Sequence, residues 1–186
     1  MKRIFDLLMC LAMLTVFLFP LVFISILVRL TSPGPVFYWS DRVGQFNQIF
    51  KMPKFRSLKI NTPAVATHLL KDPNQWLTPV GSFLRKSSLD EIPQLWSIIK
   101  GDMSFVGPRP ALFNQNDLID LRTEKGVHVL RPGLTGWAQV NGRDKLAIPE
   151  KVQLDMEYLD KRSFIFDLKI LVMTAQIVLS KSGVTH

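Results

Sequence analysis

Two adjacent carboxylates, Asp90 and Glu91, are the residues whose type and placement best suit chemistry in this sequence. An apolar run with helical spacing follows them, formed by Ile92, Leu95, Trp96, Ile98 and Ile99. Gly101 then supplies a stop signal. The sequence therefore predicts that the pair lies at a helix N-terminus, with Asp90 as the N-cap and Pro93 in the first turn. The free N–H groups of such an end favour anions, so this position suits carboxylate, phosphate or both.

The same residues also allow a purely structural interpretation. Ser88 and Glu91 are three residues apart, as in a capping box, and Asp90 would then only complement the helix dipole. The surroundings favour chemistry, because Arg85 and Lys86 precede the pair by a few residues. Neighbouring side chains on a helix diverge by about 100°, so the two carboxylates cannot aim at one atom as a glycosidase pair does. We expect them to have separate roles.

Length and charge limit the classes of protein that this chain can be. At 186 residues it forms one domain, or one domain with an appendage. The net charge of +8 implies an anionic partner, which is nucleic acid, an anionic membrane surface or a phosphorylated substrate. Cys10 is the single cysteine, so no disulfide framework or thiolate metal site follows. The three histidines lack metal-ligand spacing.

The first apolar segment predicts membrane association. Residues 7–28 carry no charge and are long enough for one membrane-spanning helix. Pro20 and the basic residues at both ends instead favour a helix that bends and leaves by the same leaflet, and both forms stay open on sequence alone. Residues 164–180, capped by Ser163, predict a final helix that is apolar almost all round, which is either buried or in the membrane interface.

Cations follow in the next segments. Residues 36–42 and 49–58 predict two strands around a turn at 44–47, with Lys54 and Arg56 on one face of the second strand. That face is either a phosphate cradle or a solvated edge defended by charge. Residues 59–77 read as a surface loop, and Thr78-Pro79 starts a short helix that delivers Arg85.

The last third adds further arginines. Prolines on both sides hold Arg109 in extended backbone, which suits bidentate binding of phosphate, and the same prolines could equally mark only a turn. Residues 111–125 predict a partly helical excursion, and 127–130 with 136–140 predict a hairpin that has Arg131 and Arg143 at its ends. Pro149 opens a helix with Glu150, Asp155 and Tyr158 as its notable polar positions.

A series of motifs runs along nearly the whole chain. They are Lys2-Arg3 with Asp6, Thr31-Ser32-Pro33-Gly34-Pro35-Val36-Phe37, Lys54-Phe55-Arg56, Arg85 with Ser88-Leu89-Asp90-Glu91-Ile92-Pro93-Gln94-Leu95, Gly101-Asp102-Met103-Ser104-Phe105-Val106-Gly107-Pro108-Arg109-Pro110, Arg131-Pro132-Gly133-Leu134-Thr135-Gly136-Trp137-Ala138-Gln139-Val140-Asn141-Gly142-Arg143, and Asp155 with Tyr158. In this order the chain resembles the bacterial sugar transferases called monotopic phosphoglycosyl transferases. The length matches small members that consist of the catalytic domain alone.

The resemblance implies a fold and a place in the cell. The fold is mainly α with β-hairpins, the α-helix-associated β-hairpin fold, in a single functional domain. Residues 1–30 would form a re-entrant membrane helix and residues 31–186 a membrane-associated catalytic domain, on the cytoplasmic face of the bacterial inner membrane. The break would lie at Pro20, where this chain has Phe19-Pro20 and the family usually has Ser-Pro.

The resemblance also implies a reaction. Such enzymes move a phospho-sugar from a UDP-sugar to polyprenol (undecaprenyl) phosphate, giving UMP and a polyprenol diphosphate sugar, as the first membrane step of glycoconjugate assembly. They need Mg²⁺, which Asp90 and Glu91 would hold. Asp90 would be the nucleophile that carries the phospho-sugar, and Glu91 would assist in metal binding or proton transfer. The residues expected to bind substrate or phosphate are Lys54, Arg56, Arg85, Arg109, Arg131, Arg143, Asp155 and Tyr158.

Two other functions remain open on the sequence. One is a membrane-tethered basic protein that binds nucleic acid or anionic lipid without chemistry, and the other is a metal-dependent phosphohydrolase that uses the same dyad. The transferase interpretation needs a UDP-sugar, a polyprenol phosphate and the bilayer as partners, and it needs no nucleic acid. A homo-oligomer is compatible with the pattern, which does not identify the sugar.

Overall fold

The structure, a computed structural model, describes residues 1–63, 72–142 and 145–180. The helices are α1 (Lys2–Thr31), α2 (Gly81–Lys86), α3 (Leu95–Lys100), α4 (Asn116–Glu124), α5 (Trp137–Val140), α6 (Ile148–Lys161) and α7 (Phe164–Leu179). The strands are β1 (Phe37–Val43), β2 (Ile49–Phe55), β3 (Ser104–Val106) and β4 (Gly133–Thr135). Short 3₁₀ helices are η1 (Gln45–Asn47), η3 (Pro73–Trp76), η4 (Leu89–Gln94) and η5 (Val127–Val129). The expected class, mainly helical with a β-hairpin, is confirmed.

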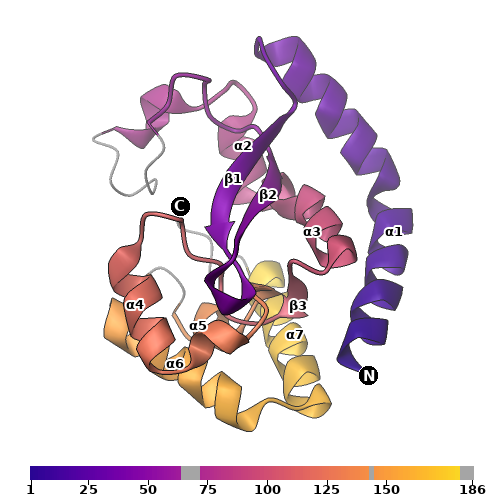
Figure 1. The fold of residues 1–186 in the computed structure, drawn as a ribbon. Coiled ribbons are helices and arrows are strands. Elements are labelled where there is room, and N and C mark those ends of the chain that lie inside the picture. The colour runs from indigo at the N-terminus through magenta and orange to yellow at the C-terminus, as the bar shows by residue number, and fades with distance from the viewer. Residues whose placement is uncertain (64–71, 143–144, 181–186) are drawn as a thin grey trace.

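Helix α1 runs along one side of the molecule, as Figure 1 shows. It is the one helix among the described residues that is long and apolar enough to cross a membrane. The helix continues through Pro20, so the expected break is not an interruption of the helix in this structure. One face packs on the protein through Cys10, Ile24 and Val28, while the opposite face exposes large apolar side chains, among them Leu8 and Phe19.

The N-terminal turn of α1 is fixed by polar contacts that we call the anchor network, formed by Lys2, Arg3, Asp6, Ser104, Tyr158 and Asp167. Lys2 Nζ donates to Asp167 at 2.5 Å and to Tyr158 Oη at 3.1 Å. Asp6 accepts from Ser104 Oγ at 2.9 Å, and Arg3 donates to the carbonyl oxygens of Ile98 and Ile99 at the end of α3. The start of α1 is therefore bound to α3, β3, α6 and α7 together.

The predicted hairpin is confirmed: β1 pairs antiparallel with β2, with Phe37 opposite Phe55 and Val43 opposite Ile49. Alternation along β2 buries Met52 while it exposes Lys51. Phe55 is also buried and packs with Leu84 of α2 and the C-terminal half of α1. The same strand lies against η4, so the hairpin brings Lys54 to the Asp90–Glu91 segment.

The predicted hairpin of residues 127–130 and 136–140 is wrong. Residues 127–129 form η5 and residues 137–140 form α5, while β4 pairs in parallel with β3. Gly107 and Gly133 explain this pairing: a Cβ at Gly133 would stand 2.1 Å from the Gly107 backbone nitrogen. Only glycine allows the two segments to approach so closely. The Gly107-Pro108-Arg109-Pro110 and Arg131-Pro132-Gly133 motifs thus form one backbone contact.

Two predicted helix starts also need correction. Asp90 is not an N-cap, because η4 already begins at Leu89 and Ser88 precedes it in a left-handed conformation (φ 56°). Thr78 is not the cap of α2, because that helix begins at Gly81 and the Thr78 hydroxyl bonds to the Ser57 carbonyl. The stop at Gly101 is confirmed, with φ 95° after the last turn of α3.

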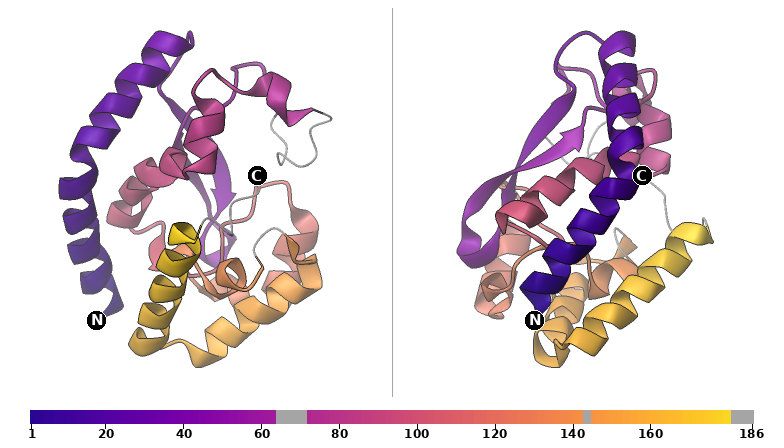
Figure 2. Two further views of the ribbon diagram at one scale, coloured as in Figure 1. Left: turned by 180° about the vertical axis from the view of Figure 1, so that it is seen from behind. Right: turned by 90° about the vertical axis from the view of Figure 1, so that its right-hand side faces the viewer.

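Helices α6 and α7 meet at an angle beside the N-terminus of α1, which both views of Figure 2 show. The expected cap of α7 is confirmed, because the Ser163 hydroxyl accepts from Phe166 N at 3.2 Å. Helix α7 is buried on one side only: Ile170 is fully buried, whereas Ile165 and Leu179 are highly exposed. Helices α4 and α6 pack on each other through Leu118 and Val152.

Candidate active site

Two basic side chains from two other segments converge on the Asp90–Glu91 pair, and we call the four residues Lys54, Asp90, Glu91 and Arg109 the dyad cluster. Lys54 Nζ lies 2.7 Å from Glu91 Oε1 and 3.9 Å from Asp90 Oδ2. Arg109 Nη2 lies 3.2 Å from the same Glu91 oxygen. The structure therefore brings together the two carboxylates, one lysine and one arginine that the sequence selected.

The two carboxylates differ in their contacts, as expected for separate roles. Glu91 is held by Lys54 and Arg109, whereas Asp90 accepts no hydrogen bond from any described residue. The Asp90 side chain is 10% exposed, so an opening to solvent remains. Asp90 is thus a buried carboxylate with few bonds to its neighbours. A nucleophile benefits from this condition, because few bonds must break before it can react.

Burial raises the pKa of Asp90, and the negative charge of Glu91 adds to the rise. The positive charges of Lys54, Arg85 and Arg109 act in the opposite direction and lower it. Arg85 therefore belongs to the electrostatic surroundings of Asp90, as predicted. The three cations therefore oppose, without cancelling, the rise in the pKa of Asp90 that burial causes.

The capping-box interpretation does not describe this site. Ser88 occupies the N-cap position, but its side chain makes no capping hydrogen bond. The Glu91 side chain, which would have to turn back to the Ser88 backbone, instead bonds to Lys54 and Arg109. The acidic pair serves the dyad cluster and does not cap the helix.

Arg42 is a member of this site that the sequence analysis missed. It lies on β1, donates to Ser40 Oγ at 3.0 Å and reaches the Pro110 carbonyl oxygen at 3.2 Å. Burial lowers the pKa of Arg42 to about 10, with a further lowering by Arg109 and an opposing rise from Glu91. Its guanidinium is therefore close enough to both residues to add positive charge. The only sequence signal was its place near the end of a strand that pairs with the Lys54 strand.

Arg122 and Asp155 support the site from behind. Arg122 Nη2 lies 2.6 Å from Asp155 Oδ2, and both side chains are nearly inaccessible. Arg122 Nη1 also donates to the Arg109 carbonyl oxygen at 2.8 Å. Asp155, predicted to contact substrate, here binds Arg122 and through it fixes the backbone of Arg109. The sequence signal for Arg122 was its spacing of four residues from the buried Leu118 on one face of α4.

Arg56 does not join the dyad cluster in this structure. Its guanidinium donates to the Pro33 carbonyl oxygen and, at 2.7 Å, to that of Ser32. The residue is 5% exposed. The expectation that Lys54 and Arg56 line one phosphate cradle is therefore wrong for Arg56, which holds the chain where α1 ends.

Arg131 and Tyr158 lie in a second place, a cavity whose lining includes no member of the dyad cluster. Arg131 is exposed and bonds through Nε to Gln45, and Tyr158 belongs to the anchor network. Desolvation and hydrogen bonding to Asp167 both raise the pKa of Tyr158. Arg143 lies outside the described residues. Of the predicted substrate contacts, Lys54, Arg85 and Arg109 thus lie at or near Asp90, whereas Arg131 and Tyr158 lie at this separate cavity.

The donors at the dyad fit the chemistry of Mg²⁺ binding together with a substrate. No group of three or more His, Cys, Asp or Glu side chains that could hold a metal occurs within residues 1–63, 72–142 and 145–180. Mg²⁺ commonly binds through one or two carboxylates and completes its shell with water and substrate phosphates. Asp90 and Glu91 offer two such carboxylates, so the site fits a metal that arrives with a diphosphate and does not fit a closed structural metal site.

Comparisons with known proteins show the family of this chain. The model of the family described as bacterial sugar transferase matches residues 1–181. The chain is 40% identical to an uncharacterized sugar transferase, EpsL, of Bacillus subtilis over 186 residues, which covers 99% of this chain and 90% of that protein.

Two named enzymes are similar over the same region. The UDP-glucose:undecaprenyl-phosphate glucose-1-phosphate transferase of Escherichia coli is 39% identical over 94% of this chain and 39% of that enzyme. The undecaprenyl-phosphate galactose phosphotransferase of Salmonella typhimurium is 36% identical over 98% of this chain and 41% of that enzyme. The chain therefore spans less than half the length of these two enzymes.

Proposed function

The chain belongs to the bacterial sugar transferase family, and on that premise we propose that it is a phosphoglycosyl transferase. It moves a phospho-sugar from a UDP-sugar to undecaprenyl phosphate, giving UMP and an undecaprenyl diphosphate sugar. The names of two similar enzymes support the acceptor and the type of group transferred. The single observation that carries the proposal is the dyad cluster, in which a buried, weakly engaged Asp90 adjoins a Glu91 held by two cations.

We propose that Asp90 attacks the phosphorus atom that bears the sugar. A bond forms between a carboxylate oxygen of Asp90 and that phosphorus, and the bond to the bridging oxygen of the diphosphate breaks, releasing UMP. A phosphate oxygen of undecaprenyl phosphate then attacks the same phosphorus and displaces the Asp90 carboxylate. Each step forms and breaks one P–O bond, so the enzyme returns to its starting state.

The cations of the site lower the barrier to bringing an anionic nucleophile to an anionic donor. A diphosphate that enters beside Asp90 meets Lys54 and Arg109, and Arg42 and Arg85 add positive charge nearby. Such groups stabilise the charge that spreads over the phosphoryl oxygens in the transition state. Asp90 and Glu91 would hold Mg²⁺, which when bound neutralises phosphate charge. Glu91 fixes the orientation of both cations.

We further propose that the enzyme is monotopic, with α1 entering and leaving the bilayer on the cytoplasmic side of the inner membrane. The N-terminal turn of α1 bonds to α3, β3, α6 and α7, and its last turns pack on Phe55 and Leu84 of the same domain. A helix straight across the bilayer would carry these polar contacts into the hydrocarbon or to the far side. The exposed apolar face of α1 instead suits insertion into one leaflet.

The decisive experiment traps the covalent intermediate. The full chain, extracted in mild detergent, is incubated with Mg²⁺ and a panel of UDP-sugars without acceptor, and its intact mass is measured. We expect a mass increase equal to one phospho-sugar, mapped to Asp90, together with one equivalent of UMP. Asp90→Asn should give no adduct, whereas Asp41→Asn, which removes an exposed carboxylate paired with Lys51, should react like the unmodified chain.

Other outcomes would identify a different enzyme. Sugar phosphate released to water, at the same rate with and without undecaprenyl phosphate, would indicate a phosphohydrolase. Full turnover by Asp90→Asn would exclude Asp90 as the nucleophile. Salt-sensitive DNA binding with no turnover of any UDP-sugar would support a binding protein without chemistry.

A further inference from the structure

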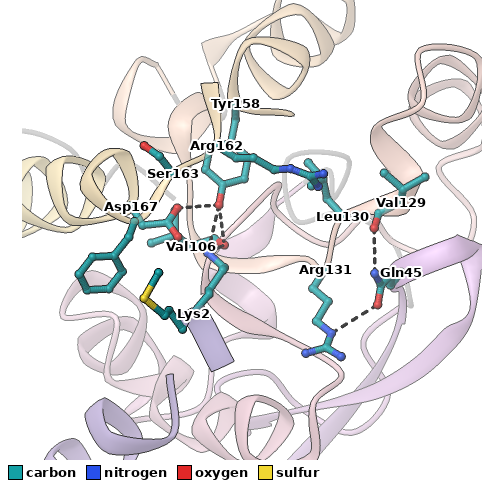
Figure 3. A pocket seen from close by; sticks show the side chains of 12 residues that line it. Lys2, Gln45, Val106, Val129, Leu130, Arg131, Tyr158, Arg162, Ser163 and Asp167 are labelled. Carbon is teal, nitrogen blue, oxygen red and sulfur yellow. Dashed lines mark hydrogen bonds and ion pairs between the residues drawn. The ribbon is translucent and has the colours of Figure 1, made fainter. Parts of the chain in front are cut away.

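The cavity beside the N-terminus of α1 has no role in the proposed reaction, and it is large enough to hold a ligand. Its volume is about 330 Å³. Its walls come from several parts of the chain: Met1 and Lys2, Gln45 at the tip of the hairpin, Leu130 and Arg131, and Arg162 to Phe164 between α6 and α7. Figure 3 labels most of these residues around the cavity. Asp90, Glu91, Lys54 and Arg109 are not among its lining residues.

One wall of the cavity is polar but already satisfied. Lys2 Nζ donates to Asp167, Tyr158 Oη and the Val106 carbonyl oxygen, and Tyr158 donates to Asp167 at 2.7 Å. These groups use their hydrogen-bonding capacity on one another, so they close the wall and leave recognition of a ligand to other residues.

Two arginines at the rim keep donors for a ligand. Arg131 uses only Nε, which donates to Gln45 at 3.3 Å, and Gln45 is itself fixed by a bond to the Val129 carbonyl oxygen. Both terminal nitrogens of Arg131 stay free of hydrogen bonds to the described residues. Arg162 forms no hydrogen bond or ion pair with any part of the chain that the structure describes. Figure 3 shows its side chain extending across the cavity toward Leu130 and Arg131. Two guanidinium groups in this arrangement suit a phosphate group.

The rest of the lining is apolar, from Val106, Val129, Leu130 and Phe164. A ligand for this cavity therefore combines an anionic phosphate group with an apolar part. A membrane lipid has both parts. Apolar side chains next to the lining residues Lys2 and Phe164 in the sequence are exposed, namely Ile4 and Leu8 of α1 and Ile165 of α7. We place this face of α1 in the bilayer under the proposed function, and insertion of Ile165 beside it would put the cavity at the level of the lipid headgroups.

We infer that this cavity is a binding site for the headgroup of an anionic membrane phospholipid, separate from the site of the reaction. Arg131 and Arg162 hold the phosphate, and the apolar walls receive the glycerol and the start of the acyl chains. The site requires that α1 and α7 associate with a membrane, and it does not require the phosphoglycosyl transfer to be correct.

The test measures binding of soluble short-chain lipids to the full chain in mild detergent by isothermal titration calorimetry. The probes are dihexanoyl phosphatidylglycerol, dihexanoyl phosphatidylcholine, farnesyl phosphate and inorganic phosphate. We expect saturable binding of the phosphatidylglycerol, with a Kd about tenfold larger or more in the R131Q/R162Q variant. The control K51Q/K125Q removes the same charge from two exposed lysines and should keep the original Kd.

The four probes distinguish the sources of a phosphate ligand. Equal affinity for phosphatidylcholine would overturn the preference for an anionic headgroup, and equal affinity for inorganic phosphate would reduce the cavity to a simple anion site. Saturable binding of farnesyl phosphate alone, lost in R131Q/R162Q, would assign the cavity to the acceptor lipid and overturn the inference. An unchanged Kd for phosphatidylglycerol in R131Q/R162Q would place the lipid elsewhere. The comparison of probes on the unmodified chain does not depend on the folding of any variant.

Discussion

The dyad cluster and the anchor network use the same kinds of residue to opposite effect. In the anchor network the carboxylates of Asp6 and Asp167 each accept bonds from fixed donors, so charge and hydrogen bonding are matched. In the dyad cluster Asp90 is similarly buried, but Lys54 Nζ lies 3.9 Å from its carboxylate and only 2.7 Å from that of Glu91. The first arrangement stabilises the fold, and the second keeps a carboxylate reactive. Both kinds of carboxylate are buried. The structural ones differ from the reactive one in having hydrogen-bond and charge partners for their oxygens.

Removing Lys54 should break the dyad cluster with the largest effect. Lys54→Met takes away the cation that lowers the pKa of Asp90 most, so that pKa rises further. We expect kcat/KM to fall about 10³-fold, equivalent to about 4 kcal/mol, and its acid limb to move to higher pH. Lys51→Met, on the same strand but exposed, is the control. A pH profile of kcat/KM that keeps its acid limb would contradict this account of Asp90.

Asp155 tests whether a buried ion pair with satisfied hydrogen bonds contributes both to the stability of the fold and to the dyad cluster. Asp155→Asn leaves the buried Arg122 without its partner, so we expect the protein to lose about 3 kcal/mol of unfolding free energy. Because Arg122 also holds the Arg109 carbonyl, the KM for the donor should rise in the fraction that remains folded. Denaturant unfolding and initial rates measure the two effects, with the exposed Asp160→Asn as control. Lost stability with an unchanged donor KM would show that the pair is only structural.

Neutralising one acid in each region should change stability in opposite directions. Asp167→Asn weakens bonds to Lys2 and Tyr158, and we expect a loss of about 2 kcal/mol. Asp90→Asn should instead raise the melting temperature at neutral pH. Burial raises the pKa of Asp90, so the stability that this group contributes in its protonated form is lost as pH rises through that pKa.

The pH dependence of the melting temperatures of Asp90→Asn and Asp167→Asn gives the control. The advantage of Asp90→Asn should disappear below the ordinary pKa of an aspartate, about 3.9, where Asp90 is protonated in both the folded and unfolded states. Melting curves of the three proteins between pH 3.5 and pH 7, roughly the range over which such a group titrates, test this. A lower melting temperature for Asp90→Asn at pH 7 would mean that Asp90 is as well satisfied as Asp167.

Arg56 should show the smallest effect, and on stability alone. Arg56→Met removes the bonds to the Ser32 and Pro33 carbonyl oxygens, so we expect a loss of about 1 kcal/mol in unfolding free energy and an unchanged donor KM. Unfolding and steady-state rates are measured on one preparation. A raised KM with normal stability would restore Arg56 to the phosphate-binding group that the sequence suggested.

The sequence predicted the parts of the fold that depend on local signals. The hairpin at β1 and β2 follows from alternation and a turn, the end of α3 from Gly101, and the cap of α7 from Ser163. It failed where distant segments decide: three residues of β4 form a strand only because β3 lies beside them. The backbone contact of Gly107 with Gly133 explains the pairing, but nothing near either glycine identifies the other.

The candidate site shows the same limit. Asp90, Glu91, Lys54 and Arg109 carry recognisable motifs, and the structure brings these four together. Arg42 and Arg122 act through contacts to Pro110, Arg109 and Asp155, none of which can be read from their own neighbours in the chain. The strand periodicity places Arg56 on the same face as Lys54, yet its guanidinium bonds to the carbonyl oxygens of Ser32 and Pro33, just after α1.

The anchor network also sets an order of events during synthesis. Asp6 is translated 98 residues before its partner Ser104, and Lys2 is translated 165 residues before its partner Asp167. The N-terminal turn of α1 therefore cannot form these contacts until the later residues have been made, while the apolar face of the helix is already available to lipid. If α1 lies in the membrane as we propose, its exposed apolar face can associate with lipid before Ser104 and Asp167 have been translated.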